Sequence, residues 1–286
     1  MSRMTKAHRF FAAAIAVAVT LGAPEVWAQR RGDWMPKKQG HRLGGIIEFW
    51  PARDFFVQSG EFVGQIAVID ELMIDFSAPA GYANYEPGYD HAVFGNPSAG
   101  AHWGDKLTEG FSMWAGGTIT FPIIFDPSSR RALAAYGLAQ NRALFDVDRF
   151  LIEYLTVRPR VGLEAHFADY FFLRGDFGFP LFIDVSGDRN DAAEFAVETA
   201  AEFEARAPVG VGGGIRMQLV GFATDDYGFY NDNVQAAIEP YFVYEPFGRA
   251  GFFARVGFLL ALDEPLGFGF DTNELATVRV TLGGKW

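Results

Sequence analysis

The chain has 286 residues, a formal net charge of −11, 30 Phe, 33 Gly and no cysteine. The acidic balance argues against nucleic acid as a partner, and the lack of cysteine excludes a disulfide framework. Many aromatic residues together with many glycines are typical of closely packed strands that face lipid.

Residues 1–28 have the pattern of a secretory signal peptide. Arg3, Lys6 and Arg9 precede an apolar run at 10–22, and Val26-Trp27-Ala28 gives an acceptable cleavage pattern before Gln29. The run is too short for a spanning helix, which needs about 20 apolar residues. We therefore predict an exported chain with a periplasmic N-terminal segment at 29–40.

The first half of the mature chain contains five stretches with strand character. In chain order they are "HRLGGIIEFW", the two parts of "EFVGQIAVIDELMIDFSAP" on either side of a turn at Asp70 and Glu71, "AVFGNPSAGAHW" and "GFSMWAGGTITFPI". In the last of these, Phe111, Met113 and Ile119 alternate with polar positions, which is the period of a strand.

The second half contains seven further stretches with the same period of two. They begin near residues 151, 171, 194, 209, 234, 250 and 276. The stretch "EFAVETAAEFEAR" has a helical composition, but Phe195, Val197 and Phe203 alternate with Glu198, Glu202 and their neighbours, so it is predicted as a strand.

The connections between these strands fall into two classes that alternate along the chain. Tight turns are expected near 104–110, 167–170, 207–208 and 246–250, whereas long polar loops are expected at 126–148, 184–192, 224–233 and 263–274. Short turns at one end and long loops at the other are typical of bacterial outer-membrane barrels. We predict an all-β fold, an antiparallel transmembrane β-barrel of about 12 strands over residues 41–286. A barrel of 8 or 10 strands with an N-terminal periplasmic extension is the alternative.

The alternation also assigns the two faces of the barrel wall. Side chains expected to face hydrocarbon include Leu155, Val161, Ile215, Leu219, Val256 and Val280. The closing run "NELATVRVTLGGKW" puts Val280, Leu282 and Trp286 on the same face, and an aromatic residue after alternating apolar positions resembles the assembly signal of outer-membrane proteins. Outer-membrane lipid, lipopolysaccharide and the barrel assembly machinery are therefore expected partners.

The opposite face carries the charges that are expected to line the lumen. They are Arg158, Arg160, Glu164, Arg174, Asp176, Glu198, Glu202, Arg216, Glu239, Arg255 and Arg279. Two interpretations remain open: the charges line a path that selects solutes, or they pair across strands and fill the lumen.

The long loop that contains "SSRRALAAYGLAQNRAL" is predicted to form a short helix capped by Ser128 or Ser129, which either covers the mouth as a lid or stands in solvent. No enzyme, cofactor or metal is expected. The histidines of the mature chain, at 41, 91, 102 and 166, stand in no serine-hydrolase motif. The run "DVSGDRND" starts like a calcium loop but lacks the required Gly and Glu, so a solvated loop is preferred.

Three short motifs, "IAVIDELMIDFSAPAGY", "FGNPSAGAHW" and "GFSMWAGGTITFP", resemble outer-membrane barrels of the meta-pathway for phenol degradation and related transporters. The matching positions are Ile69 to Glu71, Gly95 to Pro97, and Phe121 with Pro122, over about the first half of the mature chain. The resemblance implies uptake of small solutes, aromatic or hydrophobic ones among them, across the outer membrane. A structural or surface-interaction barrel with a plugged lumen is the alternative.

Overall fold

The structure is a computed structural model that describes residues 41–51, 56–84, 90–125, 129–167, 170–186, 193–223, 233–246, 251–263 and 275–286. The predicted signal peptide and the segment at 29–40 lie outside the described residues. Among the described residues, no helix is both long and apolar enough to cross a membrane.

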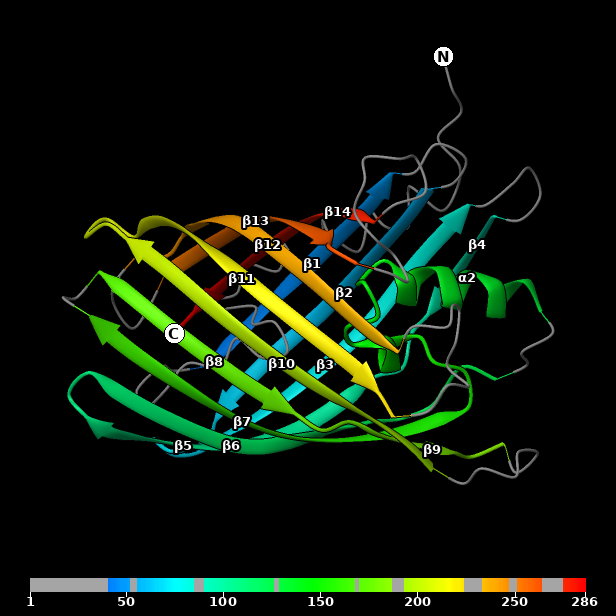
Figure 1. Cartoon of the computed structure of the whole chain (residues 1–286), viewed down its shortest axis with the longest axis horizontal. Helices are drawn as coiled ribbons and strands as arrows, with labels where there is room; N and C mark the ends of the chain where they lie inside the picture. Colours follow the sequence, from blue (N-terminus) through cyan, green and yellow to red (C-terminus); the bar gives the residue numbers. More distant parts are fainter. Residues whose placement is uncertain are drawn as a thin grey trace, which may run out of the picture.

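Antiparallel strands form one closed sheet (Figure 1). They are β1 (Arg42–Pro51), β2 (Phe56–Ala67), β3 (Leu72–Asn84), β4 (Asp90–Phe94), β5 (Ser98–Thr108), β6 (Phe111–Thr120), β7 (Tyr154–Phe167), β8 (Phe171–Gly178), β9 (Leu181–Asp184), β10 (Ala193–Arg206), β11 (Val211–Phe222), β12 (Val234–Tyr244), β13 (Gly251–Ala261) and β14 (Ala276–Lys285). β4 and β5 both pair with β3, and β8 and β9 both pair with β7 and β10, so each of these pairs is one interrupted strand. The barrel therefore has twelve strand positions, as predicted.

Pairing of β14 with β1 closes the barrel. The register joins Arg42 to Lys285 and continues through Phe49 opposite Val278. Closure removes the open sheet edge, whose unpaired backbone groups would each cost several kcal/mol in lipid. The short turn between β10 and β11 and the long connection between β6 and β7 lie at opposite ends, at the left and right of Figure 1. We call these the short-turn end and the long-loop end.

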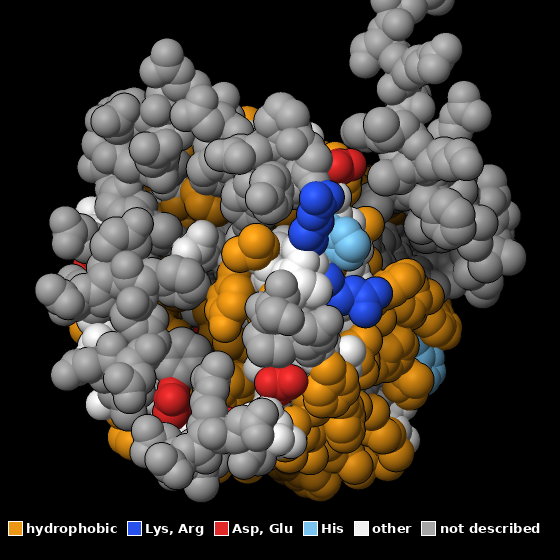
Figure 2. All heavy atoms as spheres, turned by 90° about the vertical axis from the view of Figure 1, so that its right-hand side faces the viewer, with side chains coloured by type: hydrophobic (Ala, Val, Ile, Leu, Met, Phe, Trp, Pro, Cys, Tyr) orange, Lys and Arg blue, Asp and Glu red, His pale blue; other side chains and the backbone are white. Residues whose placement is uncertain are grey.

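The two faces of the wall differ as the alternation predicts. Ile215, Leu219 and Val256 are exposed on the outside, whereas their strand neighbours Arg216 and Arg255 are buried. Figure 2 looks onto the long-loop end, where apolar side chains cover most of the coloured outer surface. A continuous exposed apolar surface of this kind is suited to lipid contact.

The loop between β6 and β7 does not behave as either alternative predicted for it. Its helix α2 (Arg130–Gln140) is capped by Ser129, whose side chain accepts a hydrogen bond from the Ala132 N–H. The loop is neither a lid over the mouth nor a solvent-exposed arm, because residues from Ala132 through the 3-10 helix η1 (Val147–Arg149) are largely buried inside the barrel. We call residues 129–153 the plug.

Apolar packing holds the plug at the long-loop end. Leu138 and Phe150 are completely buried and belong to one cluster with Trp50 of β1, Val57 of β2 and Phe182 of β9. The hydrophobic effect therefore favours insertion of the loop, since its small apolar helix face fills space that water would otherwise occupy. Leu151 also belongs to this cluster, because the strand that was expected to begin near residue 151 begins only at Tyr154.

Candidate functional site

One row of inward charges crosses the wall from β7 to β12. In the strand register Glu164 lies opposite Arg174, Arg174 opposite Glu202, Glu202 opposite Arg216, and Arg216 opposite Glu239. The sign thus alternates from each strand to the next. Opposite charges directly across a strand pair attract, whereas like charges would repel, so this register lets a strongly charged lumen stay paired.

The row continues across β13 because that strand carries a glycine. Gly257 lies opposite Arg279 of β14, and a Cβ on Gly257 would sit 2.2 Å from Glu239 Oε1. The space left by the missing side chain lets Glu239 reach across β13 to Arg279, whose Nη1 lies 2.7 Å from Glu239 Oε2. Arg279 Nε also donates to Glu48 Oε1 at 2.6 Å.

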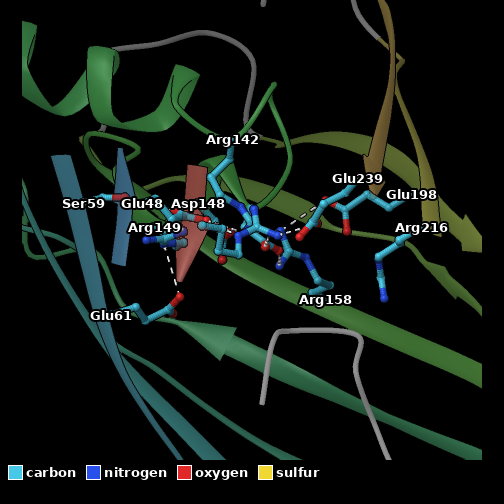
Figure 3. Close-up of polar contacts among 12 residues, drawn as sticks. Glu48, Ser59, Glu61, Arg142, Asp148, Arg149, Arg158, Glu198, Arg216 and Glu239 are labelled. Carbon is cyan, nitrogen blue, oxygen red and sulfur yellow. Dashed lines mark hydrogen bonds and ion pairs between the residues drawn. The ribbon is translucent and has the colours of Figure 1, made fainter. Parts of the chain in front are cut away.

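Glu48 of β1 joins the barrel wall to the plug. Its carboxylate accepts hydrogen bonds from Arg142 Nη1 at 2.7 Å and Arg149 Nη1 at 3.0 Å, both in the plug, and from Ser59 Oγ at 3.0 Å. Glu48 is 0% exposed. Figure 3 shows the plug arginines and the wall carboxylates meeting inside the barrel.

A second group of contacts joins the plug to β7. Arg158 donates to Asp146 Oδ1 and to Asp148 Oδ1, both at 2.8 Å, and to Glu198 Oε1 of β10 at 3.2 Å. Burial alone would lower the pKa of Arg142 in the plug, but the nearby Glu48 and Asp146 carboxylates outweigh it and raise that pKa above its ordinary value. The plug arginine therefore stays charged, and the plug is held by both apolar and ionic contacts.

Asn96, between β4 and β5, fixes both ends of the plug loop. Its Nδ2 donates to the backbone oxygens of Asp148 at 2.9 Å and Leu151 at 2.6 Å, and its Oδ1 accepts from the Ile123 N–H at 2.9 Å. Asn96 and Asp148 are 0% exposed and Leu151 is 5% exposed, so the two carbonyl oxygens depend on this amide for a hydrogen bond. The interruption between β4 and β5 thus places an amide where it satisfies three backbone groups of the loop.

The plug backbone contains an unusual concentration of left-handed residues. Among the described residues, the non-glycine positions with positive φ are Ala143 (49°), Leu144 (62°), Asp146 (52°) and Glu153 (64°), all in the plug. Each such residue costs on the order of 1–2 kcal/mol relative to a right-handed conformation. Strain of this kind clusters in segments that switch between conformations.

The short-turn half of the lumen is held by wall residues alone. Arg174 contacts Glu164 at 2.5 Å and Glu202 at 2.7 Å, and Arg255 contacts Glu202 at 3.2 Å. The Tyr241 hydroxyl lies 2.9 Å from carboxylate oxygens of both Glu202 and Glu204. This network strengthens the wall and does not involve the plug.

A small cavity remains between the plug and the wall formed by β7, β8, β10 and β11. It has room for about one or two water molecules. Its charged lining consists of Arg142, Asp146, Arg160, Asp176, Glu198 and Arg216, with Phe145 and Gln218 beside them. Asp176 accepts from Arg160 at 2.8 Å and from Arg216 at 2.9 Å.

The structure places all eleven charged residues of the sequence prediction on the inner face. Ten are buried and Arg174 is partly buried, and each has an ion pair. Their role toward a solute stays a prediction. Val280, Leu282 and Trp286 lie on the outer face, and their role in assembly also stays a prediction.

The sequence analysis missed the groups that hold the plug: Glu48, Asn96, Arg142, Asp146, Asp148 and Arg149. Glu48 alternates with Ile47 and Phe49 and was therefore detectable as an inward charge, but its inward neighbours Ile46 and Trp50 are apolar. The others lie in connections between strands, where no alternation with a period of two shows which way a side chain points.

Within the described ranges, no three metal-ligating side chains come together. The calcium-like run at 184–191 lies partly outside the described residues, and its Asp184 Oδ1 accepts from the Ser186 N–H at 2.7 Å as in a simple turn. His102 Nδ1 lies 2.6 Å from Asp75, and His166 contacts Glu164.

Comparisons with known proteins identify the fold. No family model and no curated protein matches the chain, so the resemblance to the meta-pathway barrels stays a prediction. An outer-membrane channel from Pseudomonas putida F1 matches with a TM-score of 0.62 and 11% identity over 91% of this chain and 100% of its own. The NanC porin matches with a TM-score of 0.52 and 9% identity over 85% and 98%. The chain therefore has the closed twelve-stranded barrel fold found in bacterial outer-membrane channels.

Proposed function

We propose that the chain is an outer-membrane channel for small solutes, closed by the plug and opened when the plug moves. The observation that carries the proposal is the way in which the plug is held. A separate loop fills the long-loop half of the lumen, and it is joined to the wall through Glu48 and Arg158. A segment that packs on the wall through its own apolar cluster and its own ion pairs can have two arrangements.

The strained backbone of the plug supports the same proposal. The left-handed conformations at Ala143, Leu144, Asp146 and Glu153 cost free energy that the contacts of the closed state offset. Release of the plug would relieve this strain, so the closed and open states differ by less than the contacts alone suggest. That balance favours a gate over a permanent filling of the barrel.

The proposed location is the bacterial outer membrane, reached through the predicted signal peptide. The exposed apolar outer face supports contact with outer-membrane lipid and lipopolysaccharide, and the barrel assembly machinery is the proposed assembly partner. Small solutes are the proposed cargo, and no catalysis is proposed. The aromatic or hydrophobic class implied by the meta-pathway resemblance stays a prediction.

A structural or surface-interaction barrel is the second candidate. The observation that favours it is the complete burial of Glu48, Arg158 and Arg279, each 0% exposed. Lumen side chains that never meet solvent would support a permanently filled barrel.

Liposome swelling with small neutral, anionic and cationic solutes separates the two candidates. The channel proposal expects swelling with the smallest solutes and a steep decline with solute size. Absence of swelling with every solute, from protein whose folding is confirmed by its heat-modifiable gel mobility, would support the structural barrel.

A further inference from the structure

Exposed basic residues are rare in the described part of the chain, and two of them are adjacent in the plug. Among the described residues, the exposed lysines and arginines are Lys106, Arg130 and Arg131. Lys106 lies near the short-turn end of β5, whereas Arg130 and Arg131 belong to α2 at the long-loop end. Arg131 makes no hydrogen bond or ion pair within the described residues. Its charge is therefore available to a partner outside the chain.

An exposed apolar surface lies on the outside of the wall at the same end. Phe94 of β4 is 74% exposed, which is the highest value for a large apolar side chain among the described residues. The segment 121–125 follows β6 and lies beside the junction of β4 and β5, because the Phe121 N–H donates to the Pro97 oxygen at 2.8 Å. We call the exposed side chains of this region the rim patch: Phe94, Phe121, Ile123 and Phe125.

The seated plug brings the two arginines to the rim patch. Helix α2 packs against β3 and β4 from inside, where Leu138 fills the space beside Gly81 of β3. The wall is one strand thick, and Phe94 lies on its outer side in the same strand pair. The six residues from Phe125 to Arg131 span at most about 20 Å. Figure 2 shows basic side chains next to the apolar outer surface at this end.

Lipopolysaccharide has the chemistry that fits this combined surface. Its acyl chains suit the rim patch, and the phosphate groups on its sugar headgroup suit adjacent guanidinium groups, which bind phosphate through charge-assisted and often bidentate hydrogen bonds. The long loops of outer-membrane barrels face the outside of the cell, so the proposed location puts the rim patch and both arginines in the leaflet that contains this lipid.

We infer that Arg131, with Arg130 beside it, binds a phosphate group of lipopolysaccharide whose acyl chains lie on the rim patch, and that this contact keeps the plug closed. The inference rests on the proposed function, because it names what regulates the gate. The arginines belong to the plug and the rim patch belongs to the wall, so only the seated plug presents both parts to one lipid. A ligand that binds one arrangement better shifts the equilibrium toward that arrangement.

Native mass spectrometry of the detergent-solubilised protein, titrated with bisphosphorylated lipid A, tests the binding step. Arg131→Gln should weaken lipid A binding about tenfold, since a charge-assisted hydrogen bond is lost. Lys106→Gln is the matched control, because it removes an exposed positive charge at the opposite end and should leave binding unchanged. Equal binding of lipid A to Arg131→Gln and to the wild type, or an equal loss in the control, overturns the site.

Phosphatidylglycerol is the matched lipid probe, because it is also anionic but has one phosphate group and two acyl chains. It should bind the wild-type protein severalfold more weakly than lipid A. Equal binding of the two lipids would show a general preference for anionic lipid and would overturn the assignment to lipopolysaccharide. If Arg131→Gln does not fold, this comparison on the wild-type protein decides.

Planar-bilayer recordings test the effect on the plug and separate it from the channel proposal. Lipid A in the leaflet at the long-loop end should lower the open probability of the wild type by up to about tenfold, which is the factor that Arg131 contributes to binding, and should hardly change that of Arg131→Gln. Binding that depends on Arg131 without any change in open probability overturns the effect on the plug but not the channel. Absence of conductance in every lipid overturns the channel and the regulation, whereas binding that depends on Arg131 would still support the site.

Discussion

Neutralising Glu48 should loosen the plug while leaving the barrel closed around it. Glu48→Gln removes the negative charge shared by Arg142, Arg149 and Arg279. Arg142 keeps Asp146 at 2.7 Å and Arg279 keeps Glu239 at 2.7 Å, but Arg149 keeps only Glu61 at 3.5 Å. Breaking a buried pair costs about 3–5 kcal/mol, and the retained partners favour the lower end, about 3 kcal/mol.

The loss is not spread equally over the molecule. Two of the three arginines that contact Glu48 belong to the plug and one belongs to the wall. About 2 kcal/mol of the cost therefore falls on plug closure, which corresponds to a roughly thirtyfold shift toward the open state.

Planar-bilayer recordings measure that shift as open probability. Glu202→Gln is the matched control, because Glu202 is equally buried but pairs with the wall arginines Arg174, Arg216 and Arg255. The control should lower the free energy of unfolding without raising open probability. If Glu48→Gln leaves conductance unchanged, or if both variants raise it equally, the plug is not the gate.

Three further predictions concern the anchor, the strain and the lipid face. Asn96→Ala removes the side-chain partner of two buried carbonyl oxygens and of the Ile123 N–H and should lower the free energy of unfolding by about 3 kcal/mol. A loss under 1 kcal/mol in urea titrations would show that the loop finds other partners. Glu153→Asn suits the left-handed backbone at φ 64° and should raise stability by up to about 1 kcal/mol, measured in the same titrations, whereas a loss of stability would contradict the strain argument. Val256→Arg in the middle of β13 should cost about 2–4 kcal/mol in lipid refolding, and Val211→Arg at the short-turn end of β11 only about 0–1 kcal/mol; equal costs would refute the assigned depth.

The strand positions and their facing could be predicted because they depend on local period. Residues such as Glu198, Glu202 and Phe203 alternate strictly, and a single-residue slip would put charges into lipid. The same regularity allowed the strands to be counted from the sequence. In the structure, the interruptions after β4 and β8 split two of these strands into two parts each.

The plug could not be predicted because it depends on contacts between distant parts of the chain. Arg149 reaches Glu48, which lies 101 residues earlier, and Asn141 is bonded by Thr277, 136 residues later. A helical pattern at 128–144 indicates that a helix forms, but not which side of the wall it occupies. The apolar cluster around Leu138 and the buried ion pairs around Glu48 decide that position.

Reversible tethering of the plug to the wall shows whether movement of the plug opens the lumen. The chain has no cysteine, so Ser59→Cys together with Asn141→Cys introduces a single pair of thiols where the native side chains meet at 3.1 Å. The pair can be joined by oxidation or by a short thiol-specific cross-linker, and released by reduction. If the plug is the gate, solutes will enter liposomes in the reduced state, and this flux will be lost in the tethered state. Equal flux in both states would contradict gating by the plug, and absence of flux in both would contradict a channel.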